Sequence, residues 1–277
     1  MIKLIVSDID GTLLQGTQSE LDPVLFQLIG ELNARGILFI PASGRQYHSM
    51  RRLFAPLADR LYFICENGAD IYGPEKSEED AVPLKTVQID RSVCDPLIDH
   101  ILADPSRSAL ISGSNISWMI CRHAEFLDRM ANFTRNRYRL VSDKAQIPGP
   151  IIKLAAYCSN GSPAADAEMG PLWRKRGLTV SQAGWLWLDF TLANKGTGLR
   201  ALCSMLDIQP SEVMAFGDGQ NDAPLLAAAG WGVAVENAAP DCKAAARLIA
   251  PANTEDGVAQ VIEQLLRGDL REARRAD

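Results

Sequence analysis

Short apolar runs alternate with amphipathic stretches at the start of the chain. Residues 4–6, 37–42 and 61–65 are apolar runs of the length typical of buried parallel strands. Between the first two, apolar residues recur at helical spacing after Asp22-Pro23, a pair typical of a helix N-cap and first turn. Strand and helix that alternate in this way predict a doubly wound α/β fold with a parallel sheet.

The pattern changes between about residues 81 and 190, where strands outnumber helices. Strand-like runs lie at 84–89, 108–112, 116–121, 151–158 and 178–190, and helical patterns at 92–103, 123–133 and 163–176. This mixture predicts an α+β layer. The first architecture resumes at Lys195. We therefore expect a core domain of residues 1–80 and 191–277, with an inserted α+β domain of residues 81–190.

Composition is that of an ordinary folded protein. The 277 residues, 47% hydrophobic and 22% charged, suffice for one large domain or two moderate ones. The net charge of −6 argues against a nucleic-acid partner held by broad electrostatics. We find no bilayer-spanning segment, no secretory apolar region and no C-x-x-C pair among the six cysteines. We expect a cytoplasmic protein with reduced thiols and no membrane partner.

Two carboxylates follow the first predicted strand. Asp8 and Asp10 are two residues apart, so on an extended backbone they point to the same side. Gly11 then ends the strand with a turn that a flexible residue makes easily. Open α/β sheets bind ligands at the carboxyl ends of their strands, and two acids there are costly unless a cation meets them. The alternative is a chance pair of solvated acids at a strand–turn junction.

A family resemblance begins at this stretch, which reads Asp8-Ile9-Asp10-Gly11-Thr12-Leu13-Leu14. It resembles the first motif of the haloacid dehalogenase (HAD) superfamily of phosphohydrolases. Three further stretches match that family in the right order: Ser43-Gly44-Arg45, Lys195 and Gly217-Asp218-Gly219-Gln220-Asn221-Asp222. Two flanking stretches resemble the Cof-type branch of the family, subfamily IIB: Glu66-Asn67-Gly68-Ala69 and Glu236-Asn237-Ala238. The resemblance implies a Rossmann-like core with residues 81–190 as an α/β cap over the site.

The resemblance also implies a covalent mechanism. Asp8 is the expected nucleophile, and Asp10 the expected acid/base that protonates the leaving oxygen and later takes a proton from water. The residues implied in binding phosphate or substrate are Gly11, Thr12, Ser43, Gly44, Arg45, Asn67, Lys195 and Asn221. Two alternatives stay open: Ser43 as a simple helix N-cap, and Arg45 on the surface.

Charge counting predicts a metal ion. The family resemblance implies the metal residues Asp8, Asp10 (through its backbone carbonyl), Asp218 and Asp222. If all four are ionised, Lys195 and Arg45 offset at most two charges, and the excess repels a phosphate. One Mg²⁺, a hard cation that takes oxygen ligands, brings the site near neutrality. Alternatively, Asp222 fixes the loop or a metal-bound water.

Roles within the inserted segment are more open. Trp185, Trp187 and Asp189 fall on one face of an alternating strand. We expect the two Trp side chains in the domain core rather than as a substrate platform, and Asp189 is a candidate for binding a substrate hydroxyl. A basic run is favoured as a solvated face over a second anion site; its members are Arg135, Arg137 and Arg139.

The predicted function is a magnesium-dependent phosphatase of a small phosphorylated metabolite, with a sugar phosphate favoured. One alternative is a phosphotransferase or mutase with the same aspartyl-phosphate chemistry, which would transfer the phosphoryl group instead of releasing it. The other is a non-catalytic metabolite-binding protein on this scaffold, disfavoured because no motif acid is missing. The substrate and the oligomeric state stay open.

Overall fold

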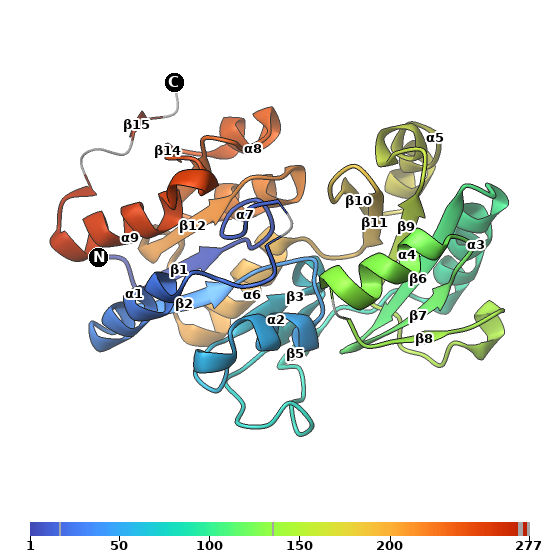
Figure 1. The fold of residues 1–277 in the computed structure, drawn as a ribbon, viewed down its shortest axis with the longest axis horizontal. Helices are drawn as coiled ribbons and strands as arrows, with labels where there is room; N and C mark the ends of the chain where they lie inside the picture. Colours follow the sequence, from blue (N-terminus) through green and yellow to red (C-terminus); the bar gives the residue numbers. More distant parts are fainter. Residues whose placement is uncertain (17, 135, 271–273, 276–277) are drawn as a thin grey trace.

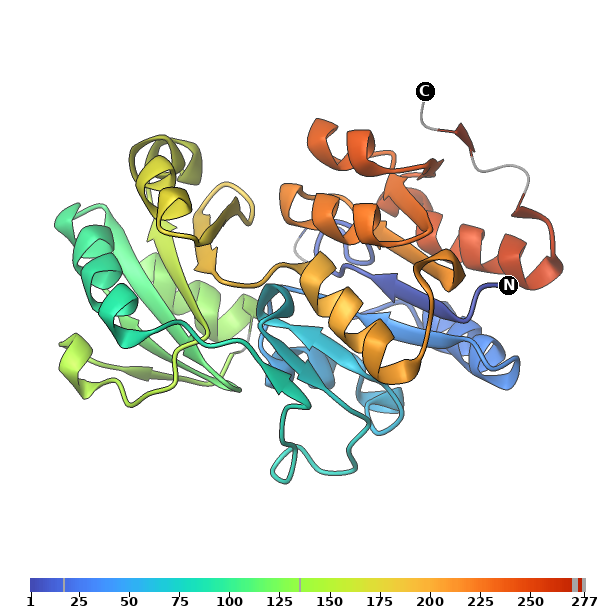
Figure 2. The same ribbon diagram turned by 180° about the vertical axis from the view of Figure 1, so that it is seen from behind.

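The computed structural model describes residues 1–16, 18–134, 136–270 and 274–275, which form two bodies side by side (Figures 1 and 2). A parallel sheet is the centre of the first body, and its strand order is β15-β14-β13-β12-β1-β2. Its parallel strands are β1 (Leu4–Ser7), β2 (Leu38–Pro41), β12 (Val213–Gly217), β13 (Trp231–Val235) and β14 (Leu248–Ala250). The short β15 (Arg274–Arg275) adds an antiparallel edge. The chain therefore reverses its winding at β1, which places the carboxyl end of β1 at the switch point where such sheets bind ligands.

Helices cover both faces of this sheet. On one face, α1 (Pro23–Ala34) packs against α9 (Gly257–Arg267). The other face carries α6 (Lys195–Leu206), α7 (Ala223–Ala228) and α8 (Pro240–Ala245), seen in front in Figure 2. The short α2 (Tyr47–Leu53) follows β2. The predicted N-cap is confirmed, because the Asp22 side chain accepts a hydrogen bond from the backbone N–H of Val24 at 2.7 Å.

The third predicted strand does not extend the parallel sheet in the way the alternation suggested. Instead β3 (Phe63–Cys65) pairs antiparallel with β4 (Asp70–Tyr72), and β4 with β5 (Lys85–Thr86). A single parallel bridge between Ala42 and Ile64 links this small sheet to the end of β2. The turn after β3 explains the difference. Glu66, Asn67 and Gly68 all have positive φ, and this left-handed turn sends the chain back along β3.

The second body is the inserted domain, built on a six-stranded sheet in the order β10-β11-β9-β6-β7-β8. The strands are β6 (Arg107–Gly113), β7 (Ile116–Ile120), β8 (Tyr138–Leu140), β9 (Lys153–Cys158), β10 (Thr179–Gln182) and β11 (Trp187–Thr191). All pairs are antiparallel except β7 with β8. The run predicted at 178–190 is thus a hairpin of two strands, and β8 has no counterpart in the sequence prediction. The α+β character of the insertion is confirmed.

The two faces of this sheet bury different layers. One face packs on α3 (Arg91–Ala103) and α5 (Ser162–Lys175). The other carries α4 (Ala124–Asp128) and the π-helical turn Arg129–Thr134. Because side chains alternate along a strand, Ala155 lies on the α4 face while Leu154 and Ala156 lie on the opposite face. The α4 face is the one that looks toward the first body (Figure 1).

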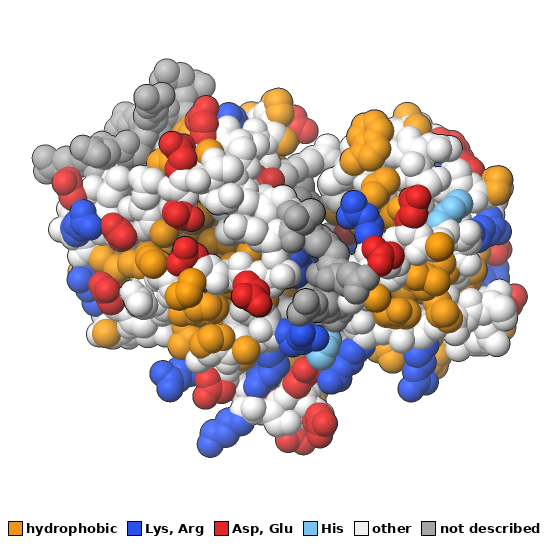
Figure 3. Space-filling view, in the orientation of Figure 1, with side chains coloured by type: hydrophobic (Ala, Val, Ile, Leu, Met, Phe, Trp, Pro, Cys, Tyr) orange, Lys and Arg blue, Asp and Glu red, His pale blue; other side chains and the backbone are white. Residues whose placement is uncertain are grey.

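Surface character adds two observations. Charged side chains of both signs are interspersed over the face shown in Figure 3. In the part of the chain that the structure describes, every helix is too short or too polar to cross a membrane.

Candidate active site

The centre of the candidate site is a buried lysine between two carboxylates. Asp8 follows β1 and is 4% exposed, and its backbone N–H donates to the Phe216 carbonyl at 3.0 Å. Lys195 is the first residue of α6, is fully buried and has its ammonium in contact with Asp8 Oδ1. The same ammonium lies 2.5 Å from Asp222 Oδ1. A cation at a helix start is unfavourable on dipole grounds, and these two carboxylates compensate it.

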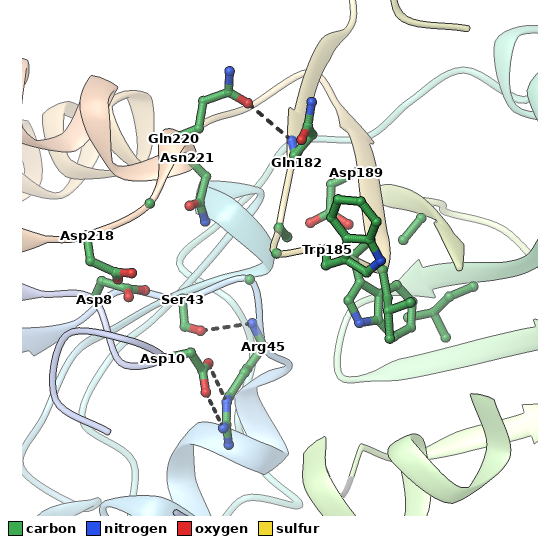
Figure 4. Close-up of a pocket in the computed structure, with 18 of the residues that line it drawn as sticks. Asp8, Asp10, Ser43, Arg45, Gln182, Trp185, Asp189, Asp218, Gln220 and Asn221 are labelled. Atoms are coloured by element: carbon green, nitrogen blue, oxygen red, sulfur yellow. Dashed lines mark hydrogen bonds and ion pairs between the residues drawn. The ribbon is translucent and has the colours of Figure 1, made fainter. Parts of the chain in front are cut away.

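A loop after β12 brings Asp218 beside Asp8. The Thr12 hydroxyl lies 2.8 Å from Asp218 Oδ1 and 3.2 Å from Asp8 Oδ2, so it links the two acids. Gly11 allows this approach. Its φ is +89°, and a Cβ there would lie 2.3 Å from Asp218 Oδ2. Asp8 and Asp218 lie close together in Figure 4.

Asp222 braces the loop as well as the lysine. Its Oδ2 accepts hydrogen bonds from the backbone N–H groups of Asp218 at 3.1 Å and Gly219 at 2.9 Å. Both of its carboxylate oxygens thus have protein partners, Lys195 for one and the loop for the other. This arrangement favours the alternative in which Asp222 fixes the loop over direct, full coordination of a metal.

The site carries excess negative charge. Burial, followed by the charge of Asp222, raises the pKa of Asp8 well above its usual range, and Lys195 opposes this only in part. Burial and Asp222 likewise raise the pKa of Asp218 to about 6. Burial alone would lower the pKa of Lys195, but Asp222 and Asp8 outweigh it and the pKa is raised. The lysine stays charged while the carboxyls compete for protons, which is the imbalance that a cation would relieve.

The carboxylates fit a divalent cation. One ligand oxygen from each of Asp8, Asp218 and Asp222 lies within 4.8 Å of the others. Carboxylate oxygens are the donors that hard cations prefer. The Asp10 side chain is not part of this group, which agrees with the expectation that Asp10 could contribute only its backbone carbonyl.

Asp10 is oriented by Arg45 (Figure 4). The guanidinium donates from Nε to Asp10 Oδ2 at 2.8 Å and from Nη2 to Oδ1 at 2.5 Å. Arg45 is 8% exposed, so the surface alternative for this residue is wrong. Ser43 is buried, and its Oγ accepts a hydrogen bond from the Arg45 backbone N–H at 3.2 Å. Ser43 and Asp10 thereby face the same space beside Asp8.

A second polar network joins the core to the inserted domain. Asn67 donates from Nδ2 to Asp189 Oδ2 at 2.7 Å, and its own Oδ1 lies 3.2 Å from Asn221 Nδ2. Lys153, from β9, is in ion-pair contact with Glu66 and lies 3.8 Å from Asp189. Burial raises the pKa of Asp189, with Lys153 opposing it. Asp189 therefore already interacts with Asn67 and Lys153, which leaves less of its carboxylate to bind a substrate hydroxyl.

One cavity of about 770 Å³ connects these groups. Its core end is polar; the residues there include Asp8, Asp10, Ser43, Arg45, Asp218 and Asn221. Its other end is largely apolar; the residues there include Leu110, Met130, Ala155, Trp185, Leu186 and Trp187. The site is thus a cleft between the bodies, with most of the acidic groups on the core side and, on the inserted side, an aromatic surface together with the cations Arg129 and Lys153.

The expectation of a Trp pair in the domain core is wrong for Trp185. This residue precedes β11, in the loop of the β10–β11 hairpin, and is 67% exposed at the cavity (Figure 4). Trp187 does pack in the domain, with its ring edge-on to Phe126 at 5.4 Å and to Tyr157 at 5.5 Å between centroids. It also lines the cavity.

The three arginines of the basic run, Arg135, Arg137 and Arg139, differ in their surroundings. Arg137 lies 3.1 Å from Glu78, so it forms an ion pair with the core, and it is 46% exposed. Arg139 is exposed. Arg135 lies outside the described residues. Neither described arginine lines the cavity, which agrees with a solvated face rather than a second anion site.

Comparison with known proteins identifies the family. A family model described as haloacid dehalogenase-like hydrolase matches residues 5–262. The chain belongs to the haloacid dehalogenase-like hydrolases. The Escherichia coli (strain K12) protein 5-amino-6-(5-phospho-D-ribitylamino)uracil phosphatase YbjI is 27% identical over 275 residues, 96% of this chain and 97% of its own. The resemblance seen in the sequence is confirmed, and so is the expectation of a phosphatase of this family.

Solved structures agree with the fold. The crystal structure of SMU.1108c from Streptococcus mutans UA159 has a TM-score of 0.86 and 26% identity, covering 96% of this chain and 100% of that one. The structure of the HAD subclass IIB sugar phosphatase BT4131 has a TM-score of 0.80 at 20% identity, covering 95% of this chain and 98% of that one. At that identity it shows the fold alone. The predicted HAD core with an inserted α+β domain is confirmed.

Three charged residues of this HAD-family site were missed by sequence reasoning: Lys153, Glu66 and Arg129, which lines the cavity. Lys153 stands inside the apolar run Ile151-Ile152-Lys153-Leu154, and a cation in such a run needs a buried anion. Glu66 was noted for its family motif and not as part of the site. The signal for Lys153 was present in its apolar surroundings, but its partner Glu66 comes from another domain and could not be named.

Proposed function

We propose that this chain is a magnesium-dependent phosphatase that hydrolyses a small phosphorylated metabolite through an aspartyl-phosphate on Asp8. The observation that carries the proposal is the Asp8–Lys195–Asp222 contact with Asp218 alongside. It presents one carboxylate as a nucleophile, while Asp222 is held by the lysine and the loop and Asp218 by the Thr12 hydroxyl. We further propose that residues 1–80 and 191–277 do the chemistry and that residues 81–190 act as the cap.

In the first step, Asp8 attacks phosphorus and the bond to the leaving oxygen breaks. Lys195 holds the Asp8 carboxylate by one oxygen, Oδ1, which leaves Oδ2 as the attacking atom beside Thr12. The Asp10 side chain, oriented by Arg45, gives a proton to the leaving oxygen. The Ser43 hydroxyl and the Gly44 backbone N–H bind the phosphoryl oxygens.

In the second step, water attacks the phosphorus of the aspartyl-phosphate, and Asp10 takes the proton from that water. Phosphate leaves and Asp8 returns as a carboxylate. Asp8, Asp218 and the Asp10 backbone carbonyl would hold Mg²⁺, with Asp222 supporting the loop. When bound, this ion neutralises charge on the phosphoryl group and in the acidic cluster.

The cavity supports a small substrate with an extended leaving group. The polar end accommodates the phosphoryl group, and the aromatic end would cover the rest of the molecule. We keep a sugar phosphate as the favoured substrate, the class in the name of the structural neighbour BT4131. The phosphorylated ribityl compound in the name of the E. coli relative combines a sugar-alcohol chain with a planar ring, and the two Trp side chains would suit such a ring.

A phosphate-release screen tests the proposal. The purified protein would be assayed with Mg²⁺ against sugar phosphates, nucleotides and cofactor phosphates, with the Asp8→Asn variant as the matched control. We expect release of inorganic phosphate from at least one compound by the wild type and a loss of at least ~10³-fold in the variant. Transfer of the phosphoryl group to a second sugar without phosphate release would support a mutase instead. Absence of turnover across the panel would support a binding protein.

A further inference from the structure

Lys153 is a buried cation of the inserted domain that contacts the core. It is 4% exposed and begins β9, the strand between β11 and β6. A buried ammonium needs partners, because it has lost its water. It forms an ion pair with Glu66 and donates a hydrogen bond to the Gly44 carbonyl at 2.7 Å. Gly44 belongs to a core turn that lines the cavity, and Glu66 to the turn after β3, which is hydrogen-bonded to the Gly44 turn.

All three carbonyls of the Ser43-Gly44-Arg45 turn accept hydrogen bonds. The Ser43 carbonyl accepts from the Asn67 N–H at 3.0 Å, and the Arg45 carbonyl from the Glu66 N–H at 3.0 Å. The carbonyl between them, that of Gly44, accepts from Lys153. The middle peptide of the turn is therefore held by the inserted domain, while its two neighbours are held by the core.

The N–H group of this middle peptide, between Gly44 and Arg45, is hydrogen-bonded to the Ser43 hydroxyl. In a trans peptide the C=O and N–H groups point in opposite directions, and the Gly44–Arg45 bond is trans. With the Gly44 carbonyl turned to Lys153, the Arg45 N–H points the other way and donates to Ser43 Oγ at 3.2 Å (Figure 4). A cation on the carbonyl oxygen polarises the peptide and strengthens its N–H as a donor. Ser43 Oγ then acts as acceptor here, which leaves its own hydrogen to donate to a phosphoryl oxygen.

We infer that Lys153 is a positioning residue for phosphate binding, acting through the Gly44–Arg45 peptide on the Ser43 hydroxyl. The inference rests on the proposed function, in which Ser43 binds the phosphoryl group. It means that the core alone does not complete the anion site, because the inserted domain contributes the group that sets the turn. Since every substrate carries the same phosphoryl group, the effect of Lys153 is the same whatever the leaving group.

The test begins with Lys153→Met and Lys153→Arg, with Lys144→Met as the matched control. Lys144, like Lys153, is a lysine of the inserted domain that forms an ion pair. Its partner is Asp99 of the same domain, and it does not line the cavity. We would measure kcat and KM for p-nitrophenyl phosphate and for acetyl phosphate, and the Kd of inorganic phosphate by titration calorimetry with Mg²⁺. We expect Lys153→Met to lower kcat/KM about tenfold for both substrates and to weaken phosphate binding by a similar factor.

Lys153→Arg should recover part of the loss, because it keeps the charge and can donate to a carbonyl. Lys144→Met should match the wild type. Equal kcat/KM and phosphate Kd in Lys153→Met and wild type would overturn the inference, as would a loss confined to one of the two substrates. Failure of the proposed function itself would look different, since the wild type would then hydrolyse neither substrate.

A double-mutant cycle with Ser43→Ala identifies the route. If Lys153 acts through Ser43, Lys153→Met in the Ser43→Ala background should cost less than about twofold further. Losses that multiply would overturn the assigned route. Should Lys153→Met fold poorly because Glu66 is left buried without its cation, the pair Glu66→Gln/Lys153→Met removes both charges together and is used in the same cycle.

Discussion

Arg45 holds the Asp10 carboxylate at two points, with Nε 2.8 Å from Oδ2 and Nη2 2.5 Å from Oδ1. The arginine is 8% exposed, and its backbone N–H also donates to Ser43 Oγ. One residue therefore orients the expected acid/base through its side chain and the expected phosphate ligand through its backbone. The Asp10 side chain is 40% exposed, and this two-point contact restricts the rotation of its carboxylate.

Arg45→Met should lower kcat more for an alkyl phosphate than for p-nitrophenyl phosphate. The alkyl leaving group needs a proton from a correctly oriented Asp10, and we expect a loss of about 10- to 100-fold for it. The nitrophenolate leaves without a proton, so only the second step should suffer. Steady-state kinetics with both esters measure this. Equal losses would mean that Arg45 acts mainly on phosphate binding.

Lys195→Met should destabilise the metal-free protein as well as remove activity. It leaves Asp8 and Asp222 buried without their cation, at a cost of ~3 kcal/mol in the free energy of unfolding at pH 7. The cost should shrink as the pH falls toward 5, because burial raises the pKa of Asp8 well above its usual range and a protonated Asp8 no longer needs the ammonium. Urea unfolding at the two pH values checks this. A variant as stable as the wild type at pH 7 would show that Lys195 does not stabilise the buried carboxylates of Asp8 and Asp222.

Magnesium affinity should depend on pH. Asp218 has a pKa of about 6 without metal, raised by burial and by Asp222, and only the ionised carboxylate binds the cation. Above pH 6 the Asp218 carboxyl is already ionised, so its part of the pH dependence should level off. Below pH 6 it must lose a proton, so affinity should fall by at least about tenfold per pH unit. Calorimetry in buffers of different ionisation enthalpy should show more proton release at pH 6 than at pH 8. A Kd that is the same at pH 5 and pH 8 would contradict the account.

Trp185→Ala should alter substrate discrimination with little effect on folding. The side chain is 67% exposed at the aromatic end of the cavity. For the best compound from the phosphate-release screen we expect kcat/KM to fall about fivefold to tenfold, the scale of one aromatic contact. Acetyl phosphate, whose leaving group is too small to reach the indole, should be hydrolysed as by the wild type. Trp231→Ala, at an exposed Trp outside this cavity, is the matched control.

Local motifs made the chemistry of the core predictable. Asp8, Lys195 and Asp218 were named from short stretches that follow predicted strands or begin a helix, and the parallel sheet brings those ends together. The pairing of β3 was not predictable in this way. Its apolar pattern fits either sheet, and the left-handed turn at Glu66 and Asn67 decides which strand it meets.

Relationships between the domains were harder to predict. The Lys153 contacts with Glu66 and Gly44 join residues about a hundred positions apart, so spacing along the chain carries no sign of them. The side chain of Trp185 was expected in the domain core because strand residues alternate between two faces. That alternation does not hold at Trp185, which lies in the turn between β10 and β11. The exposed edge strand β8 lacks a buried apolar face that a pattern could reveal.

The most direct test of the central claim is to trap the phosphorylated enzyme. The Asp10→Asn variant lacks the base for the second step, so the aspartyl-phosphate should accumulate on it. We would mix this variant with p-nitrophenyl phosphate and Mg²⁺, quench in acid within one turnover and map the protein by peptide mass spectrometry. The account predicts one added phosphoryl group on the peptide that contains Asp8, and none when Asp8→Asn is combined with Asp10→Asn. Nitrophenolate release without any phosphorylated Asp8 peptide would contradict it.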